Sequence, residues 1–515
     1  MDHPQRSNAP SNEKPPAGSF AELWRLALPL ILSSGSLSLM LFVDRMFLTW
    51  YSPSALAAAM PAGLLHWTVI SVVIGTATYV NTFVAQYEGA GRKDLAAASV
   101  WQGIYLSVGA GVAFLTVLPF APWIFKFIGH EPLVEQMEVN YFSILCLGAV
   151  PITMTAALSS FYSGRGETRT VMGVNMLVAG VNMLLDYCLI FGAGPFPQMG
   201  IRGAALATVI ANVVAVCMFT ALMCRRREQL EYKFWKRWQL DRELFGRLLR
   251  YGLPTGFQFF ADIASFAVFI FLVGRSGQAQ LAATNLAFNL NMLAFIPMLG
   301  CGTAVMTLVG KRIGEGRPEI AVRTTWLAFG VAGTYMGAFA AVYLFLPDVI
   351  LAPFALNQSS AEFAEIRDQV IPLLRFLAVF SVFDGMAIIF GSAIRGAGDT
   401  RFSLIFASLT GWLLMVLPTW AAWNWLDGDL YVSWTACTVY ICVLGVGLLI
   451  RFQTGHWKSM RVIEQTPAET TARPRQLDLE ISSTVDYVPV LTMLSDACSD
   501  GEDDPVEPAE IGADS

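Results

Sequence analysis

The sequence predicts an all-α integral membrane protein of about twelve transmembrane helices in two parallel six-helix repeats. Three observations carry this prediction: the composition, the spacing of apolar windows, and a repeat of the chain against itself. Apolar residues make up 55% of the 515 residues and charged residues only 14%. A soluble domain carries about 25% charged residues. The chain therefore leaves little room for a large soluble domain.

The apolar windows are long enough to cross a bilayer, which takes about 20 residues per helix. They fall near residues 20–48, 55–80, 98–122, 137–160, 168–191, 201–224, 250–273, 281–308, 322–346, 368–390, 401–421 and 431–451. An even number of spans puts both termini on one side of the membrane. Of the 33 Lys and Arg residues, 27 lie on that side. By the positive-inside rule we expect a multi-pass protein of the cell inner (plasma) membrane with both termini in the cytoplasm.

The chain repeats itself at a nearly constant offset. Gly89, Gly91 and Arg92 recur 225 residues later as Gly314, Gly316 and Arg317, and residues 164–169 recur at 396–401. Two halves with six helices each insert in the same orientation, which predicts parallel repeats about an axis along the membrane normal. The expected organisation is an N-terminal cytoplasmic segment 1–19, a first half 20–224, a basic linker 225–249, a second half 250–451 and a tail 452–515.

The tail differs from the rest of the chain. It holds 13 acidic residues against 4 basic ones and no apolar run of spanning length. Such a composition is typical of disorder. We expect a solvated cytoplasmic extension, with a regulatory or partner-binding role as the alternative.

Four aspartates, Asp44, Asp186, Asp262 and Asp384, lie inside the apolar windows. A charge at bilayer depth costs several kcal/mol, so such residues usually mark an ion, proton or substrate path. The alternative is a structural role in capping or bridging helices. Four acids at matched depths favour the functional interpretation.

The expected depths divide the aspartates into two groups. At about 1.5 Å per residue, Asp262 and Asp384 lie about 16–18 Å from the inner-face arginines, near mid-membrane. Asp44 and Asp186 lie farther out, at about 25–28 Å. Asn182 is four residues before Asp186 and so shares its helix face, and Thr208 has a similar depth. We therefore predict a first-half oxygen-rich site, suited to a hard cation, and a second-half acidic site: Asp44, Asn182, Asp186 and Thr208 in the first, Asp262 and Asp384 in the second.

Pro29 opens the first helix of the first half, and Pro254 takes the same place in the second. An interior proline removes a backbone hydrogen bond and invites a kink, so Pro29 is a candidate hinge. The alternative is a proline in the first turn that only positions the helix.

The sequence shows no arrangement of residues typical of an enzyme active site. The four histidines are scattered, and the sequence has no His-Glu-x-x-His motif and no serine nucleophile elbow. We predict that the protein is not an enzyme and needs no cofactor. We also expect no nucleic-acid partner, no metal other than Na+, and a monomer among membrane lipids.

At these residues the chain resembles the multidrug and toxic compound extrusion (MATE) family, most closely its NorM-type branch. The resemblance covers roughly residues 20–451 and rests on the order and spacing of several short pieces. They are Leu28-Pro29, Phe42 to Asp44, Val84 to Gly91, Asn182 to Asp186, Gly203 to Thr208, Gly252 to Asp262, and Asp384 with Arg395-Gly396.

The resemblance implies export of small organic compounds, often cationic and aromatic, by antiport with Na+ or H+ through alternating access. It also implies that the first-half residues form the cation site and that Asp262 and Asp384 form an acidic site for cation or substrate. One departure is that the NorM-type pattern commonly has Glu where this chain has Asp262. A flippase for lipid-linked oligosaccharide or polysaccharide of the wider superfamily is the alternative, although it would be expected to have a basic cavity.

Overall fold

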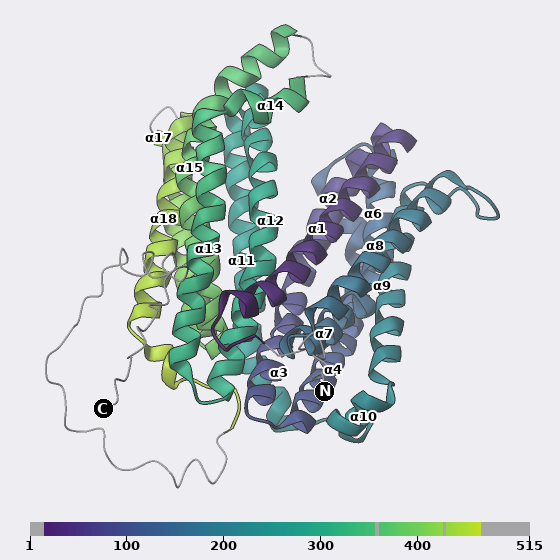
Figure 1. Ribbon diagram of the computed structural model, residues 1–515. Helices are drawn as coiled ribbons and strands as arrows, with labels where there is room; N and C mark the ends of the chain where they lie inside the picture. The colour runs from purple at the N-terminus through teal and green to yellow at the C-terminus, as the bar shows by residue number, and fades with distance from the viewer. Residues whose placement is uncertain (1–14, 356–359, 426–428, 465–515) are drawn as a thin grey trace, which may run out of the picture. The chain divides into compact units, whose positions relative to one another are not determined.

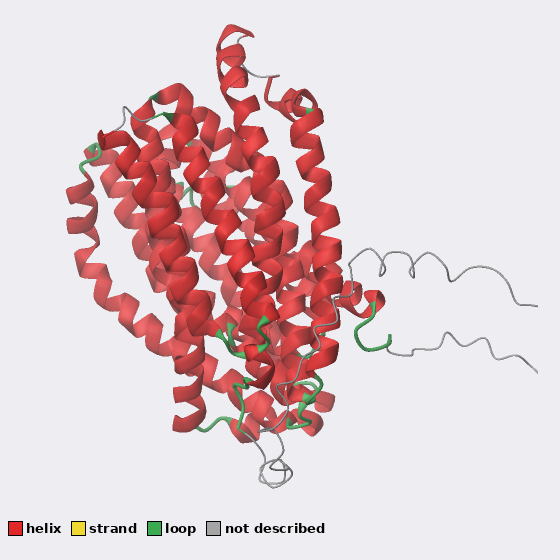
Figure 2. Cartoon of the chain, turned by 90° about the vertical axis from the view of Figure 1, so that its left-hand side faces the viewer, coloured by secondary structure: helices red, strands yellow, loops and turns green. Residues whose placement is uncertain are grey.

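The computed structural model describes residues 15–355, 360–425 and 429–464. Over these ranges the chain forms helices and connecting loops and no strand (Figure 2). Residues through Ile463 belong to one compact unit. The expected disorder of the N-terminal segment and of the acidic tail concerns mainly residues outside the described ranges.

The first half runs from α1 to α9 (Figure 1). Its elements are α1 (Phe20–Tyr51), α2 (Pro53–Thr78), α3 (Val80–Gly89), α4 (Lys93–Val117), η1 (Leu118–Phe120), α5 (Ala121–Ile128), α6 (Pro132–Leu147), α7 (Ala149–Gly164), α8 (Thr168–Phe191) and α9 (Ile201–Met223).

The second half runs from α11 to α18. Its elements are α11 (Arg242–Val273), η3 (Gly274–Ser276), α12 (Gln278–Gly314), α13 (Pro318–Phe345), α14 (Pro347–Ala355), α15 (Ser360–Ala397), α16 (Thr400–Thr410), the π-helix η4 (Gly411–Val416), α17 (Leu417–Trp425) and α18 (Leu430–Gln453).

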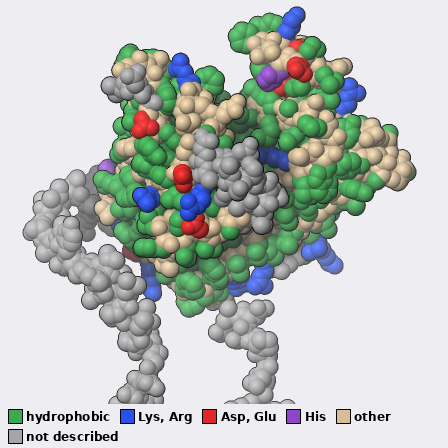
Figure 3. All heavy atoms as spheres, turned by 90° about the horizontal axis from the view of Figure 1, so that it is seen from above, with side chains coloured by type: hydrophobic (Ala, Val, Ile, Leu, Met, Phe, Trp, Pro, Cys, Tyr) green, Lys and Arg blue, Asp and Glu red, His purple; other side chains and the backbone are tan. Residues whose placement is uncertain are grey.

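The predicted fold class is confirmed. Eleven helical spans of the described residues are long and apolar enough to cross a membrane, and α6 with α7, bent by 46° at their junction, makes a twelfth. Large hydrophobic side chains such as Leu32, Val112 and Ile405 are exposed on these helices, as expected for lipid-facing surfaces. In Figure 3 charged side chains are sparse among the hydrophobic ones.

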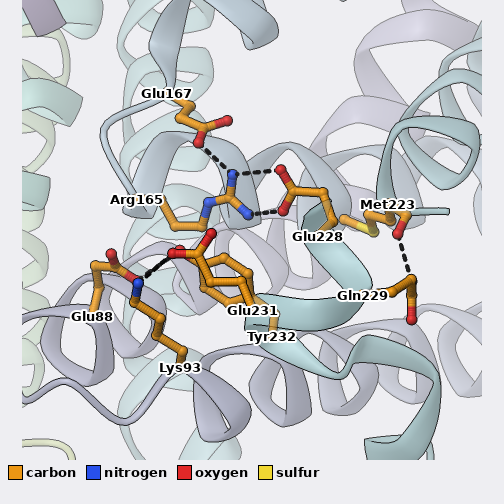
Figure 4. A network of polar contacts seen from close by, with 9 residues as sticks. All are labelled: Glu88, Lys93, Arg165, Glu167, Met223, Glu228, Gln229, Glu231 and Tyr232. Atoms are coloured by element: carbon orange, nitrogen blue, oxygen red, sulfur yellow. Dashed lines mark hydrogen bonds and ion pairs between the residues drawn. The ribbon is translucent and has the colours of Figure 1, made fainter. Parts of the chain in front are cut away.

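The linker between the halves is folded. It contains α10 (Arg226–Tyr232) and η2 (Phe234–Arg237), and α11 begins inside the expected linker, where the Asp241 side chain accepts hydrogen bonds from the first backbone N–H groups. α10 is held to the first half by Arg165, which pairs with Glu167 and Glu228, and by an ion pair between Lys93 and Glu231 (Figure 4).

The folded unit also continues past the expected boundary at residue 452. Trp457, in the short helix η5 (His456–Ser459), is fully buried and stacks on Phe452 with ring centroids 5.0 Å apart. Val462 and Ile463 are buried as well. Residues 452–463 therefore belong to the folded unit, and four of their side chains, Phe452, Trp457, Val462 and Ile463, are buried in it.

The two halves are joined at the end of the molecule that carries α3 and α10, which we call the α10 end. Three pairs of helices make the main contacts between the halves: α1 with α12, α2 with α11 and α3 with α12. Three buried polar groups make hydrogen bonds across the boundary: Asn81 to Thr307 Oγ1 at 2.9 Å, Gln86 to the Gly396 carbonyl at 3.0 Å, and Tyr79 to the Arg395 carbonyl at 2.8 Å. From this end the two groups of helices diverge (Figure 1).

The repeated glycines account for part of this junction. Gly91 and Gly316 both have φ of +72°, a backbone conformation that favours glycine, and form tight turns. Gly89 and Gly314 instead lie at close contacts between the halves. A Cβ atom at Gly89 would overlap the Lys311 carbonyl, and one at Gly314 would overlap the Gln86 carbonyl. Since Lys311 is the repeat counterpart of Gln86, the two contacts are symmetric.

Pro29 lies within α1, past its first turn, and Pro254 lies well inside α11. The alternative that Pro29 only starts its helix is therefore excluded. Its role as a hinge stays a prediction.

Candidate cation and substrate sites

The first-half residues come from three adjacent helices. Asp44 lies on α1, Asn182 and Asp186 lie on α8, and Thr208 lies on α9. α8 packs against both α1 and α9, which brings these positions together. Asp44, Asn182 and Asp186 are buried, and Thr208 is half-buried.

Asn182 links α9 to the carboxylate of Asp186. With its amide oriented to satisfy both neighbours, its nitrogen donates to Asp186 Oδ2 at 3.0 Å and its oxygen accepts from the Thr208 backbone N at 3.2 Å. The Thr208 hydroxyl donates to the Ala204 carbonyl of its own helix at 3.2 Å. The oxygen of this hydroxyl still has lone pairs with which it could bind a cation.

Each of the two first-half aspartates keeps one buried oxygen, Oδ1, without a hydrogen-bond partner. The carboxylates of Asp44 and Asp186 interact electrostatically with each other and with the Tyr141 hydroxyl of α6. Two like charges in a low-dielectric site repel, so a bound cation or proton would stabilise this arrangement. Sequence reasoning missed Tyr141, because a tyrosine in an apolar span gives no distinctive signal.

The second-half acids share a neighbour, although no direct contact between their carboxylates is seen. Asp262 on α11 and Asp384 on α15 both interact electrostatically with Tyr440 on α18. Asp384 is buried and its Oδ2 has no partner, whereas Asp262 is half-buried and accepts a hydrogen bond from Gln258. Whether the pair forms one site stays a prediction.

Arg395 is a further charged group of the second half. It lies in the last turn of α15, is half-buried, and interacts electrostatically with Asp262. Its guanidinium donates to Ser392 Oγ at 3.3 Å. The first-half cluster also has a neighbouring arginine, since Arg45 interacts electrostatically with Asp44.

The second half also departs from regular helix beside its acids. The π-helix η4 carries Gly411, where a Cβ atom would lie 3.4 Å from Ser265 Oγ and 3.7 Å from the Tyr440 ring. Such irregular turns are frequent at functional sites. Trp412 of η4 and Trp420 of α17 line an apolar cavity of about 450 Å³ with Val268 and Leu272 of α11.

Within the described residues, no three His, Cys, Asp or Glu side chains are placed to hold one metal ion. The first-half cluster is of another kind, with two carboxylates, an amide and a hydroxyl. Such oxygen ligands suit a weakly bound hard cation.

Comparisons with known proteins agree on one family. The MatE family model matches residues 29–188 and 254–420. The chain is similar to the probable multidrug resistance protein NorM of Thermotoga maritima, with 26% identity over 449 residues, covering 86% of this chain and 94% of that protein. It is also similar to the protein of that name from Pseudomonas syringae, with 27% identity over 460 residues, covering 88% and 98%.

Solved structures share the fold. A multidrug resistance MATE family transporter of the MOP superfamily, in an outward-facing conformation, superposes with a TM-score of 0.76 at 23% identity over 85% of this chain and 96% of that one. A MOP superfamily transporter from Pyrococcus furiosus gives a TM-score of 0.75 at 22% identity, with coverage of 85% and 96%.

Proposed function

The chain belongs to the MatE family, and we propose that it is a multidrug efflux transporter that exports organic compounds by antiport with Na+ or H+. The relatives named NorM support multidrug efflux, since they match the chain over nearly their whole length. The substrates we expect are small, often cationic and aromatic. The protein would act in the cell inner membrane as a monomer with both termini in the cytoplasm.

One observation carries the coupling proposal. Asp44 and Asp186 are buried, interact electrostatically, and each keep an unpartnered oxygen. Neutralising this pair with Na+ or a proton would remove the repulsion between the two carboxylates. Because Asp44 lies on α1 and Asp186 on α8, binding of a cation or proton to the pair would change how these two helices pack against each other.

Coupling to substrate would run through α1. This helix packs against α8 of its own half and against α12 of the other, and Pro29 lies within it. A bend at Pro29 would change both contacts at once, which links cation binding to the relative position of the halves. Linkage of this kind is reciprocal, so substrate release would also favour cation binding.

The second-half acids are proposed to act on substrate or cation at mid-membrane. Asp262 and Asp384 with Tyr440 give a site that combines negative charge with an aromatic ring, as an organic cation requires. The interaction of Arg395 with Asp262 lowers the net negative charge there, so a substrate cation would compete with Arg395 for Asp262.

The flippase remains the second candidate, because Arg395 supplies a basic group that could hold an anionic lipid-linked sugar. The four aspartates within the spans argue for cationic cargo. The fold alone does not distinguish the two, since the Pyrococcus furiosus transporter shares it while the polarity of its binding pocket is described as reversed, with a different function suggested.

The decisive experiment is transport of ethidium in inverted membrane vesicles, with the Na+ and pH gradients imposed separately. Dye uptake driven by either gradient would support antiport and identify the coupling ion. Absence of dye uptake under both gradients, with a well-inserted protein, would contradict the efflux proposal and favour the flippase.

A further inference from the structure

A cavity of about 320 Å³ opens beside the turn between α7 and α8, at the α10 end of the first half. The proposed transport cycle makes no use of it. Three helices meet there: α1 near its start, α8 at its first turn, and α10 at its N-cap and first turn. The lining residues are Arg25, Gly166, Glu167, Thr168, Arg169, Thr170, Arg225 and Glu228.

Most of the acidic charge at this cavity is already paired. Arg165 lies beside the cavity with its side chain almost wholly buried, and it contacts Glu167 Oε1 at 2.6 Å and Glu228 Oε1 at 3.2 Å (Figure 4). Burial alone would lower the pKa of the Arg165 guanidinium, but its hydrogen bond with Glu228 and the nearby negative groups raise it above the ordinary value. Arg165 therefore remains charged.

The arginines that line this cavity, unlike its glutamates, are mostly without a partner of opposite charge. Arg25, Arg169 and Arg225 are exposed, and none of their guanidinium groups makes a hydrogen bond or ion pair with another described residue. Together with Arg165 they face two glutamates, which leaves a surplus of two positive charges around one cavity.

Neutral donors complete the lining. Thr168 is 1% exposed, and its hydroxyl has no partner. It opens α8, a helix of 24 residues whose N-terminus no side chain caps. The first backbone N–H groups of such a helix, and the positive end of its dipole, favour an anion.

The repeat supplies a comparison for this turn. In the second half the equivalent turn is Gly398, Asp399 and Thr400. There Asp399 pairs with Arg451 Nε at 2.8 Å, and Val462 covers the turn, since a Cβ atom at Gly398 would lie 3.1 Å from Val462 Cγ1. The protein's own chain thus occupies the position that is a cavity in the first half.

We propose that the first-half cavity binds a phosphate-bearing anion. Arg25, Arg169 and Arg225 would neutralise the charge, and Thr168 with the N-terminus of α8 would donate hydrogen bonds to the phosphate oxygens. The geometry favours the headgroup of an anionic phospholipid. Trp24 and Phe20, next to Arg25 on α1, are exposed and stacked, and Leu28 and Leu32 continue an exposed apolar face along the same helix. Aromatic side chains of this kind lie at the headgroup level of a bilayer.

The test uses the full-length protein in detergent and native mass spectrometry. Titrations with phosphatidylglycerol, with diacylglycerol of the same acyl chains, and with inorganic phosphate compare a charged lipid, an uncharged lipid and the free anion. We expect phosphatidylglycerol to bind and diacylglycerol to bind at least about tenfold more weakly, since a charge-assisted hydrogen bond contributes roughly 1.5–3 kcal/mol. Competition by inorganic phosphate would assign the site to the free anion, and its absence would assign it to lipid.

Matched variants locate the site. The double variant Arg169→Gln with Arg225→Gln and the single variant Thr168→Val, which keeps every charge, should each weaken phosphatidylglycerol binding at least about tenfold. Thr168→Ser should bind as the wild type does, which separates loss of the hydroxyl from misfolding. The repeat counterparts Arg401→Gln and Thr400→Val should have no effect. Equal weakening by the counterpart variants, or equal binding of diacylglycerol, would overturn the proposal.

Discussion

The two halves repeat a scaffold and differ in their chemistry. Gly89 and Gly314 make symmetric contacts across the boundary, and the turns at Gly91 and Gly316 have the same φ. The intramembrane acids do not follow this repeat. At the 225- and 232-residue offsets, Asp44 and Asp186 correspond to Phe269 and Pro418. The positions that hold the halves together are therefore alike in the two halves, and the positions of the proposed sites differ.

The helix that bears Asp186 shows the divergence most clearly. α8 is a regular helix from Thr168 to Phe191. Its counterpart is interrupted by the π-helix η4, which ends two residues before Pro418. Proline cannot donate a backbone hydrogen bond, so Pro418 favours an irregular turn before it. Asp186, its counterpart in α8, has a backbone N–H and does not disturb its helix in this way. We infer that the halves perform different steps, cation binding in the first and substrate binding mainly in the second.

The largest effect should follow removal of one charge from the first half. Asp44→Asn keeps the shape of the side chain but removes its charge from the pair with Asp186, so gradient-driven efflux should be abolished while membrane insertion is preserved. Dye efflux from cells with matched expression measures this. Asp348→Asn, an exposed aspartate of α14 that pairs with Arg367, is the control. Wild-type efflux by Asp44→Asn would mean that the first half does not couple.

A smaller effect is expected from the second half. Asp262→Asn and Asp384→Asn should each reduce drug resistance several-fold or shift its pH optimum. Because both acids interact with Tyr440 rather than with each other, a double-mutant cycle should give a smaller coupling energy than the cycle between Asp44 and Asp186. Equal coupling in the two cycles would show that the halves hold equivalent paired sites.

Among stability effects, the largest should come from Trp457. Its side chain is fully buried, and its indole N–H donates to the Phe452 carbonyl at 2.8 Å, so Trp457→Ala should cost about 3–5 kcal/mol. Thermal unfolding in detergent should show a clear decrease. Trp238→Ala, at an exposed position, should change the midpoint little. If Trp457→Ala is equally harmless, residues 456–463 do not stabilise the fold.

The symmetric glycine contacts predict equal effects in the two halves. Gly89→Ala and Gly314→Ala each place a methyl group against a backbone carbonyl, so each should destabilise the protein by about 1–3 kcal/mol. Gly330→Ala, where the added methyl meets no atom within 4 Å, serves as the control for helix propensity. Clearly unequal effects of the first two changes would show that the junction is not symmetric.

The smallest effect is expected from the acidic tail. Deletion of residues 465–515 leaves Trp457, Val462 and Ile463 in place, so efflux and detergent stability should stay nearly unchanged. The comparison is with Trp457→Ala, a few residues upstream. A several-fold change in efflux by a normally inserted deletion variant would identify the tail as a regulator.

The sequence predicted the spans and the repeat because both depend on patterns that survive without tertiary contacts. Twenty apolar residues must cross a bilayer as helix, and identical glycines at one offset reveal a duplication. It also grouped Asp44 with Asn182 and Asp186, since helix periodicity and depth are enough for that. Tyr141, Gln258 and Arg395 were missed as site neighbours, because an isolated tyrosine or glutamine has no signature and Arg395 lies outside the apolar window. The burial of Trp457 was missed because a short polar segment gives no sign of docking.

Gln86 shows what kind of surface must separate when the α10 end opens. Its amide nitrogen donates to the carbonyls of Gly396 and Ala397, and its oxygen accepts from the Val462 backbone N at 3.0 Å. Asn81 and Tyr79 make similar bonds nearby. Hydration of these groups would replace each lost bond with one to water, at a net cost of about 0.5–1.5 kcal/mol per bond. Opening an apolar junction would instead cost about 25 cal/mol for every Å² of apolar surface exposed to water. In the proposed cycle, the amide and hydroxyl groups of this junction can thus be hydrated and paired again, so that water takes part in the opening step.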